Sequence, residues 1–517
     1  MSAAEKPDAP ISGTEEEHTL QRVRREKLAR LRDLGVNPYP YRFDASHSLA
    51  SLRELHGASD TEKLAAEKPA ARVRGRIRTF RPQGKAGFAD IVDGSGKVQA
   101  YFRKDQLAEI EFKVYQELDI GDFVGLEGFV FKTRSGELTV HVEKLTLLGK
   151  SLRPLPVPKE ELRPDGQRVV HDRFADKELR YRQRYVDLIL NPEVRSVFQK
   201  RTAVIRTIRR YLDERGFLEV ETPILQPLYG GATARPFTTH HNALGMTLYL
   251  RIANELYLKR LIVGGIERVY EFAKDFRNEG MDRSHNPEFT MLELYQAYGD
   301  YGDMMEIVES VVPLCAEEVC GTRQIVYHEQ LIDLSPPWPR LPMIEGIKKH
   351  AGIDIKGMSE EELRLVCREH HIEVDPRMGA GKLIDEIFSA KVQPHLVQPA
   401  FITDYPVETS PLAKRHRSDP SLTERFEAFI AGSEIGNAFS ELNDPIDQRE
   451  RFRAQMELKD KGDDEAQVLD EDFLRALEYG MPPTGGLGIG IDRLVMLLTD
   501  APSIRDVIFF PQMRPEE

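Results

Sequence analysis

The chain has 517 residues, of which 30% are charged and 40% apolar, and its formal net charge is −13. This length is sufficient for several domains with large cores, and the composition is that of an ordinary globular protein. The acidic balance argues against a protein that coats nucleic acid without selectivity, although a local basic patch would still bind RNA. Three cysteines without a CxxC pair provide no disulfide framework, which fits a reducing compartment.

Residues 1–19 are small, polar and acidic, and they contain no apolar segment typical of a secretory signal. We therefore expect a disordered tail at this end. No run in the sequence approaches the ~18 apolar residues that a membrane span requires. A cytoplasmic protein that does not enter a membrane is the expectation.

Residues 20–34 are predicted to form a helix, because leucines recur at helical spacing and Gly35 follows the last turn. Val23 is expected on the same apolar stripe. The opposite face is strongly basic and carries Arg22, Arg24, Arg25, Lys27, Arg30 and Arg32. Two interpretations remain open for this face, a solvated surface or a surface that contacts phosphates.

Residues 71–148 contain about five short β-type runs separated by glycine-containing turns, which favours a small barrel of the OB-fold type. With the preceding helix they are expected to form a domain over residues 20–152. Alternation gives the first strand an arginine face and the next hairpin a mixed face, namely Arg72, Arg74, Arg76 and Arg78, then Phe88, Asp90, Gln99 and Tyr101. Basic and aromatic surfaces of OB-folds bind single-stranded nucleic acid. The alternative is a set of solubilising arginines around a barrel core.

Residues 153–176 hold four prolines and many charges and are interpreted as a linker to a second domain at 177–517. A long amphipathic helix is predicted over 191–215, with Asn191 as N-cap and Pro192 in the first turn. Gly216 ends this helix. A strand over 217–223 follows and is stopped by Pro223.

A hairpin is predicted from strand-like runs at 269–273 and 289–295, joined by a polar loop. Arg277 and Glu279 stand where the first strand ends. On the return strand, alternation brings four side chains to one face, namely Phe289, Met291, Glu293 and Tyr295. Such a face suits a ligand better than a core, since it offers a ring for stacking and a carboxylate for a cation beside a guanidinium. The alternative is an exposed hairpin with a surface ion pair.

Residues 322–395 are interpreted as a helical excursion, with helices near 343–350 and 359–371. Two further strands are predicted at 426–430 and 434–442, and the second is expected to align Ile435, Asn437, Phe439 and Glu441 on one face. Glu427 and Glu434 form a carboxylate pair of the kind that binds Mg²⁺. Strict alternation turns Glu434 away from Asn437, so one shared pocket requires a β-bulge near Gly436.

A glycine-rich strand over 485–490 runs directly into an apolar helix that begins near Asp492. Its glycines allow another backbone or a nucleotide to approach closely. Arg493 lies in the first turn of the helix, where free backbone amides favour phosphate. No GxxxxGK[ST] loop occurs in the sequence, so a nucleotide site here would not be a P-loop.

Three separated stretches together resemble motifs 1, 2 and 3 of the class II aminoacyl-tRNA synthetases: residues 216–223, 276–279 and 488–493. The OB-like domain in front of them is similar to that of subclass IIb, which comprises the aspartyl, asparaginyl and lysyl enzymes. Runs at 230–237, 248–260 and 434–444 resemble the lysyl-tRNA synthetases within this subclass. The resemblance extends over residues 20–515.

The resemblance implies an α+β protein in which the OB-fold barrel precedes a six- or seven-stranded antiparallel sheet flanked by helices. It implies ATP-dependent activation of L-lysine to lysyl-adenylate and transfer to the 3′-terminal adenosine of tRNA(Lys). Mg²⁺ is the implied metal, with about two to three ions per active site and no zinc. A homodimer through the motif 1 helix at 191–215 is also implied.

Site residues follow from the same resemblance. Arg277 and Arg493 are the implied catalytic residues, and the implied ATP site contains Arg277, Glu279, His285, Phe289 and Arg493. The implied lysine site contains Gly231, Glu255, Arg277, Glu293, Tyr295, Asn437, Phe439 and Glu441. Mg²⁺ is assigned to Glu427 and Glu434, and anticodon reading to Phe88, Gln99 and Glu137.

The acidic character of the amino-acid site discriminates among the members of subclass IIb. Two carboxylates and a phenol suit an ammonium group, whereas an aspartate side chain would need fixed cations. An aspartyl or asparaginyl enzyme is thus the nearest alternative. An inactive relative that binds RNA, or an enzyme that attaches lysine to a protein, are alternatives of other classes.

Overall fold

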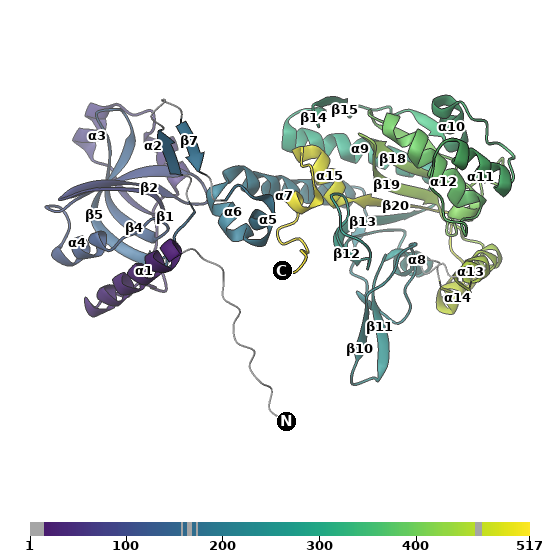
Figure 1. Ribbon diagram of the computed structural model, residues 1–517, viewed down its shortest axis with the longest axis horizontal. Helices are drawn as coiled ribbons and strands as arrows, with labels where there is room; N and C mark the ends of the chain where they lie inside the picture. Colours follow the sequence, from purple (N-terminus) through teal and green to yellow (C-terminus); the bar gives the residue numbers. More distant parts are fainter. Residues whose placement is uncertain (1–14, 157–158, 163–167, 172–173, 461–467, 517) are drawn as a thin grey trace. The chain divides into compact units, whose positions relative to one another are not determined.

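The computed structural model describes residues 15–156, 159–162, 168–171, 174–460 and 468–516. The chain divides into two compact units, Met1–Ala175 and Asp176–Glu517 (Figure 1). Most of the predicted tail, residues 1–14, and parts of the predicted linker lie outside the described residues. The described part of the linker contains a two-stranded hairpin of β6 (Lys159–Leu162) and β7 (Arg168–His171).

Unit 1 contains the predicted five-stranded barrel, closed in the order β1-β2-β3-β5-β4. Its strands are β1 (Ala70–Gln83), β2 (Ala86–Val92), β3 (Lys97–Arg103), β4 (Phe123–Lys132) and β5 (Leu138–Gly149). Inward-pointing residues such as Val73, Ile91 and Val140 are fully buried, as alternation requires. Only the β3–β5 pair is parallel among the described barrel strands.

Four helices surround the barrel, α1 (Glu15–Asp33), α2 (Leu49–His56), α3 (Thr61–Glu67) and α4 (Glu109–Gln116). The prediction for α1 was partly wrong, because its basic face is divided between two roles. Arg24 is buried and donates to the carbonyls of Ile120 and Ser151, and Lys27 pairs with Asp119 at 2.7 Å. Arg22, Arg25 and Arg32 stay exposed, and Val23, expected on the apolar stripe, is exposed too.

A buried cluster of ion pairs lies just after the end of β5, where the chain leaves the barrel. The fully buried Lys150 ammonium lies 2.5 Å from Asp119 and 2.8 Å from Asp122. Burial raises the pKa of Asp122, whereas the hydrogen bonds from Lys150 and Lys27 overcome burial at Asp119 and lower its pKa. Removal of the lysine charge would leave the buried Asp122 carboxylate without a cation, whereas Asp119 would keep Lys27.

We expect Lys150→Met to destabilise unit 1 by ~3–5 kcal/mol, because it breaks a buried ion pair from one side. The single tryptophan, Trp338, is buried in unit 2 and reports on that unit. Thermal unfolding of the intact chain should therefore show a lower transition by circular dichroism while the tryptophan fluorescence transition stays in place. Lys144→Met is the control, since Lys144 is exposed and lies 3.6 Å from Glu127. Equal shifts for the two variants would contradict the role of the cluster.

Unit 2 is built on an eight-stranded sheet in the order β16-β17-β18-β19-β20-β13-β12-β8. The strands are β8 (Leu218–Glu219), β12 (Arg268–Phe276), β13 (Glu288–Ala297), β16 (Arg340–Pro342), β17 (Ala400–Thr403), β18 (Arg425–Ile430), β19 (Ser433–Ser440) and β20 (Thr484–Gly490). The pairs at the two edges are parallel and the inner ones antiparallel. The expected six or seven strands were too few, because short strands extend both edges.

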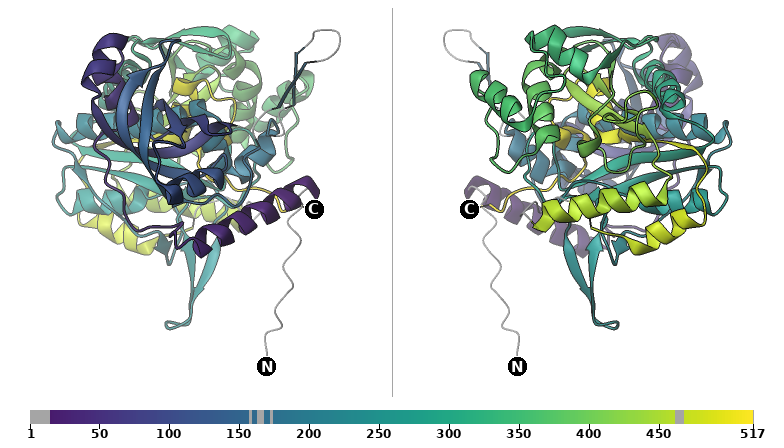
Figure 2. Two further views of the ribbon diagram at one scale, coloured as in Figure 1. Left: turned by 90° about the vertical axis from the view of Figure 1, so that its left-hand side faces the viewer. Right: turned by 90° about the vertical axis from the view of Figure 1, so that its right-hand side faces the viewer.

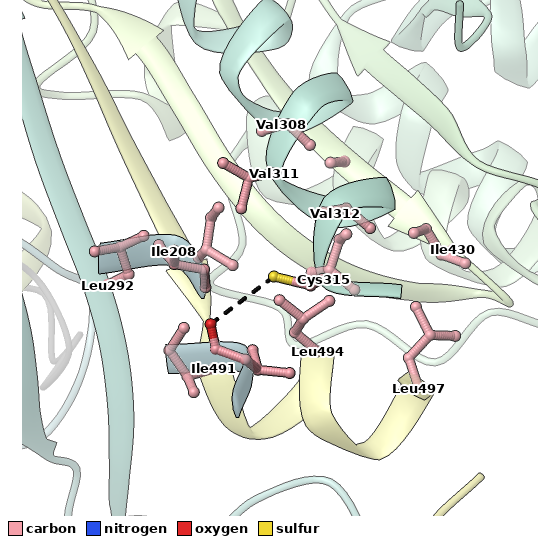
Figure 3. Close-up of a cluster of buried hydrophobic side chains, with 14 of the residues drawn as sticks. Ile208, Leu292, Val308, Val311, Val312, Cys315, Ile430, Ile491, Leu494 and Leu497 are labelled. Atoms are coloured by element: carbon pink, nitrogen blue, oxygen red, sulfur yellow. Dashed lines mark hydrogen bonds between the residues drawn. The ribbon is translucent and has the colours of Figure 1, made fainter. Parts of the chain in front are cut away.

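Three helices cover one face of this sheet, α7 (Pro192–Asp213), α9 (Tyr301–Cys320) and α15 (Ile491–Thr499). Figure 3 shows their shared core, in which the Cys315 thiol points to the carbonyl oxygen of Val204 at 3.9 Å. Burial raises the pKa of Cys315 to about 12, so this thiol is a neutral core group. The helix α7 begins after Asn191 as predicted, but the Asn191 side chain donates to Asp187 and does not cap the helix.

The predicted excursion contains the two expected helices, α10 (Met343–Ala351) and α11 (Glu360–Glu369), and also α12 (Ala380–Lys391). A hairpin of β14 (Gln324–Tyr327) and β15 (Gln330–Asp333) precedes them. The remaining elements are α5 (Lys177–Arg182), α6 (Arg184–Leu190), β9 (Leu225–Gln226), β10 (Thr238–His241), β11 (Met246–Leu250), α8 (Glu255–Val263), η1 (Gln393–His395), η2 (Val407–Thr409), α13 (Pro445–Asp460), α14 (Glu471–Glu478) and α16 (Ile504–Val507).

The β10–β11 hairpin projects from the body of unit 2 in every view (Figures 1 and 2). None of the described helices is both long and apolar enough to cross a membrane.

Candidate active site

A cavity of about 410 Å³ opens on the sheet face of unit 2 that α7, α9 and α15 leave free. Alternation separates the two faces along β13, where Leu292 and Leu294 enter the helix-covered core. Four side chains of the same strand line the cavity, as predicted: Phe289, Met291, Glu293 and Tyr295. Arg277 and Glu279, just beyond the end of β12, lie in its wall, so the hairpin is no exposed surface loop.

The glycines of β20 make room for these side chains. Tyr295 stands opposite Gly486 and Glu293 opposite Gly488 in the strand register. A Cβ atom on Gly486 would lie 1.9 Å from an oxygen of Glu441 and 2.5 Å from the Tyr295 ring, and one on Gly488 would lie 2.9 Å from Glu293. Because β20 has glycines at these positions, it leaves the space that the Glu441, Tyr295 and Glu293 side chains occupy.

A β-bulge in β19 brings the predicted carboxylate pair into the cavity. Gly436 pairs with Ala428, but Glu434 pairs with Phe429, so Ile435 has no partner of its own across the strands. The bulge predicted near Gly436 is thereby confirmed. Placing Ile435 beside Asn437 was wrong, because the bulge turns this side chain into the core. Glu427, Glu434 and Asn437 all line the cavity, together with Phe439 and Glu441.

Three carboxyl groups gather at the inner end of the cavity, from Glu255 on α8, Glu293 on β13 and Glu441 just after β19. Burial raises the pKa of Glu293 to about 8 and that of Glu441 well above its ordinary value. The Tyr295 hydroxyl donates to Glu293 at 3.1 Å. Neither oxygen of the Glu441 carboxylate has a hydrogen bond of regular geometry within the described residues. An acidic, desolvated pocket of this kind requires a cation.

Sequence reasoning missed two basic residues here. Lys259 lies one turn after Glu255 on α8 and forms buried ion pairs with Glu255 and Glu441. Arg425 lines the cavity two residues before Glu427 and donates to it at 2.7 Å, and its Nε donates to Asn437 at 3.1 Å. Both signals were in the sequence, because helix spacing i, i+4 and strand spacing i, i+2 bring side chains to one face.

The outer part of the cavity contains an aromatic ring, two guanidinium groups and a pair of carboxylates, namely those of Phe289, Arg277, Arg493, Glu427 and Glu434. The Arg277 guanidinium lies 5.0 Å from the centre of the Phe289 ring. Arg493 donates to a carboxylate oxygen of Glu434 at 3.2 Å, and one of its nitrogens lies 3.5 Å from Nε2 of His285. These groups suit a nucleotide with its phosphates.

The orientation of Arg493 depends on its neighbour Asp492, which is buried. One Asp492 oxygen accepts from Arg201 at 2.5 Å, and the other accepts from the backbone amide of Thr290 at 2.7 Å. The first turn of α15 is thereby fixed to both α7 and β13. Gly231 completes the opposite wall with a φ of +87°, and a Cβ there would lie 3.2 Å from the Cβ atoms of Ala253 and Glu255.

The carboxylate pair at the outer end consists of Glu427 and Glu434, which were predicted to bind Mg²⁺. Burial, and next the charge of Glu434, raise the pKa of Glu427 to about 7. Within the described residues, no group of three or more His, Cys, Asp or Glu side chains is arranged to bind a metal ion. A Mg²⁺ ion bound by this pair would take its other ligands from water or from a phosphate-containing ligand.

A second candidate surface lies on the barrel of unit 1. Phe88 stacks on Tyr101 with ring centres 4.6 Å apart, and Gln99 accepts from Thr139 at 3.1 Å. Glu137, two residues before Thr139, pairs with Arg53 at 3.2 Å. The three predicted anticodon residues therefore gather around the β3–β5 pair, where residue 99 stands opposite residue 139.

The arginine face of β1 does not continue this surface. Arg74 donates to the carbonyl of Phe43 at 2.6 Å, and the Arg76 guanidinium lies 4.1 Å from the centre of the Phe123 ring. A register shift between Ile77 and Thr79 separates these arginines from the part of β1 that pairs with Phe88. The expectation of one combined basic and aromatic face was wrong for Arg74 and Arg76.

Comparison with known proteins identifies both domains. Residues 176–514 match the family described as tRNA synthetases class II (D, K and N), and residues 71–148 match the OB-fold nucleic acid binding domain. The chain belongs to the class II tRNA synthetases. The family identified from three short motifs is thereby confirmed, and the match covers every strand of the eight-stranded sheet.

Relatives named lysine–tRNA ligase are similar to this class II chain over nearly its whole length. The protein of Moorella thermoacetica is 54% identical over 97% of this chain and 99% of its own length. That of Pelotomaculum thermopropionicum is 54% identical over 98% and 97%, and that of Porphyromonas gingivalis 53% over 96% and 85%.

Gly486→Ala should destabilise the class II chain by ~1–3 kcal/mol, because the added methyl group overpacks the wall between Glu441 and Tyr295. Gly490→Ala is the matched control in the same strand, since its nearest neighbours would lie 3.8 Å away in the Arg493 side chain. Denaturant unfolding followed by Trp338 fluorescence measures both variants. If Gly486→Ala is as stable as Gly490→Ala, the close approach at Gly486 does not exist.

Proposed function

We propose that the chain is a lysine–tRNA ligase, which activates L-lysine with ATP and transfers it to the 3′-terminal adenosine of tRNA(Lys). The observation that carries the proposal is the charge of the cavity. Its inner end gathers three buried carboxyl groups from Glu255, Glu293 and Glu441, and its outer end carries Arg277 and Arg493. A ligand with two ammonium groups fits the first region and a phosphate fits the second.

Lysine would lie with its side chain toward the inner end. Glu293 and Glu441, with the Tyr295 hydroxyl, would accept hydrogen bonds from the ε-ammonium, and Glu255 with the Gly231 backbone would hold the α-ammonium. Asn437 and Arg277 would hold the carboxylate, and Phe439 contributes an apolar wall for the methylene groups. The carboxylate thereby comes close to the outer end, where the reaction takes place.

ATP would occupy the outer end of the cavity. The adenine would stack on Phe289 and against Arg493, with Glu279 accepting from the exocyclic amino group. His285 lies next to Arg493 and would face the phosphates. The Arg277 guanidinium would contact both the α-phosphate and the lysine carboxylate and so connect the two substrates.

Activation requires one bond to form and one to break at the α-phosphorus. The lysine carboxylate attacks in line, an O–P bond forms, and pyrophosphate leaves with the electrons of the broken P–O bond. Arg277 and Arg493 stabilise the charge that grows on the phosphate oxygens. Glu427 and Glu434 would hold Mg²⁺, which neutralises phosphate charge when bound. No side chain acts as a covalent nucleophile.

Transfer follows when the hydroxyl of the terminal adenosine attacks the lysyl carbonyl and AMP leaves. The barrel surface of Phe88, Gln99 and Glu137 would read the anticodon, by stacking and by hydrogen bonds to base edges. A dimer through α7 is supported by exposed apolar residues that follow this helix, namely Leu218 (52% exposed), Ile224 (45%), Leu225 (48%) and Leu228 (45%). We assign the protein to the cytoplasm, where its substrates occur.

Aspartyl and asparaginyl activities are the alternatives within the same family, whose description includes D, K and N. An aspartate side chain would meet Glu293 and Glu441 without an intervening cation, which is strongly unfavourable in a buried site. The pocket charge therefore favours lysine.

Charging of total tRNA with labelled lysine, aspartate and asparagine tests the proposal. We expect lysine alone to be attached, since only lysine neutralises the inner carboxylates. Attachment of aspartate or asparagine would assign the chain to a sister enzyme. No attachment of any amino acid, with ATP still bound, would indicate an inactive relative.

Phe88→Ala should impair tRNA charging and leave lysine-dependent pyrophosphate exchange unchanged, because stacking on a base contributes ~1–3 kcal/mol and the adenylate cavity lies in unit 2. Phe123→Ala is a control on the same barrel, in β4, because Phe123 is exposed and packs against Arg76 on the part that does not continue the Phe88 surface. A parallel loss of charging and exchange in Phe88→Ala would show that the residue supports folding and does not contact tRNA.

Lysine binding should strengthen with increasing pH toward pH 8. In the empty pocket burial raises the pKa of Glu293 to about 8, and the ammonium binds only the ionised carboxylate. Below that pKa, binding must expel a proton, so the lysine KM should fall by up to ~10-fold per pH unit and level off near pH 8. Pyrophosphate exchange between pH 6.5 and 8.5 measures this, with the ATP KM as internal control. A lysine KM that is independent of pH would exclude a protonated Glu293.

A further inference from the structure

The Lys259 side chain is fully buried, and the reaction described above assigns it no role. It projects from α8 toward the acidic end of the cavity and pairs with Glu255 from its own helix and with Glu441 from the region after β19. Its ammonium also lies 5.3 Å from the Phe439 ring centre and 6.0 Å from that of Tyr295. Every one of these four partners lines the cavity.

The two oxygens of Glu441 are in different surroundings. One, Oε2, contacts the Lys259 ammonium. The other, Oε1, lies at the place where a Cβ on Gly486 would intrude, and neither oxygen has a hydrogen bond of regular geometry within the described residues. Lys259 therefore pairs with one oxygen of this carboxylate, and the other oxygen lies beside Gly486 of β20, which lines the cavity.

The number of charges at the inner end of the cavity also points to Lys259. Three carboxylates at the inner end would carry three negative charges, but lysine brings only two ammonium groups. A third cation is needed for neutrality, and Lys259 is the one that contacts these carboxylates directly. A buried charge without compensation is strongly unfavourable, so the balance affects binding and not only folding.

Resting on the proposed function, we infer that Lys259 is a positioning and specificity-determining residue. It acts as a resident cation that fixes Glu255 and Glu441 and leaves the pocket with a net demand for two positive charges, the number that lysine supplies. Its action is indirect, since it contacts the carboxylates and not the reacting atoms. An amino acid with one ammonium group would leave a carboxylate uncompensated.

Lys259→Met tests this inference, because methionine keeps the length of the side chain and removes its charge. We expect the lysine KM in pyrophosphate exchange to rise ~10-fold or more, since each truncated buried charge pair weakens binding to that extent. The ATP KM should stay within ~2-fold, because the outer end of the cavity is unchanged. A packing role for Lys259 predicts instead that methionine is tolerated.

Arg260→Met is the matched control. Arg260 follows Lys259 on α8, but it pairs with Asp470 and Asp472 away from the cavity. This variant loses the same charge and should keep the lysine KM of the wild type. If Arg260→Met raises the lysine KM as much as Lys259→Met does, the effect belongs to the helix and the inference is overturned.

Lys259→Ala provides a second test through chemical rescue. Propylammonium contains the atoms that this substitution removes and should restore the lysine KM, whereas propan-1-ol of similar size should not. If the variants fold poorly, the melting temperature becomes the measurement, and propylammonium must raise it while propan-1-ol does not. Equal effects of the two compounds would overturn the inference.

The two proposals fail separately. A wild-type chain that supports no lysine-dependent exchange contradicts the proposed function itself. A wild-type chain that is active with lysine, together with a Lys259→Met variant of unchanged lysine KM, contradicts only the role of Lys259.

Discussion

Burying three carboxyl groups around one cavity is the physical constraint on which unit 2 depends. Carboxylates removed from water repel one another, and each needs a cation or a proton. Glu293 meets this need with a raised pKa and a hydrogen bond from Tyr295, and Glu441 with an ion pair to Lys259. Such a site is unfavourable without a ligand and becomes favourable when a ligand with two ammonium groups enters it, so the buried carboxyl groups determine which ligand binds.

The sheet provides this geometry through two departures from regular β-structure. The bulge at Ile435 allows Glu434 and Asn437 to serve one cavity although they belong to opposite faces by simple alternation. The glycines of β20 leave space where Glu441, Glu293 and Tyr295 project. Behind the sheet, α7, α9 and α15 form a continuous apolar core, which holds the strands rigid under the polar side chains.

Much of this architecture was predictable from local signals. The barrel strands, the hairpin of Arg277 and Phe289, and the strand before Arg493 have strong periodicity and turn residues, and all were found at their predicted places. The bulge was predictable too, because Glu434 and Asn437 lie on opposite faces of a regular strand and were both expected in one pocket. These features depend on short stretches of chain, where alternation and turn chemistry decide the structure.

The features that sequence reasoning missed depend on distant contacts. Arg24 and Lys27 look like a solvated face until residues 118–122 and 151 pack against them. In the sequence, Lys259 resembles an ordinary helix partner of Glu255. Its second ion-pair partner, Glu441, lies 182 positions away in the chain. The separation of Arg74 from Phe88 arises from a register shift that no local sequence pattern predicts. Tertiary contacts decided each of these cases.

Calorimetric titration of the wild-type protein with L-lysine and L-norleucine at pH 8 tests the central claim most directly. The two amino acids share the same chain length and differ in the ε-ammonium group. If unsatisfied charge determines selectivity, lysine binds and norleucine binds at least ~100-fold more weakly, because the inner carboxylates then remain unpaired. Norleucine binding within ~10-fold of lysine would contradict the account, since it would show that the acidic end of the cavity does not select its ligand.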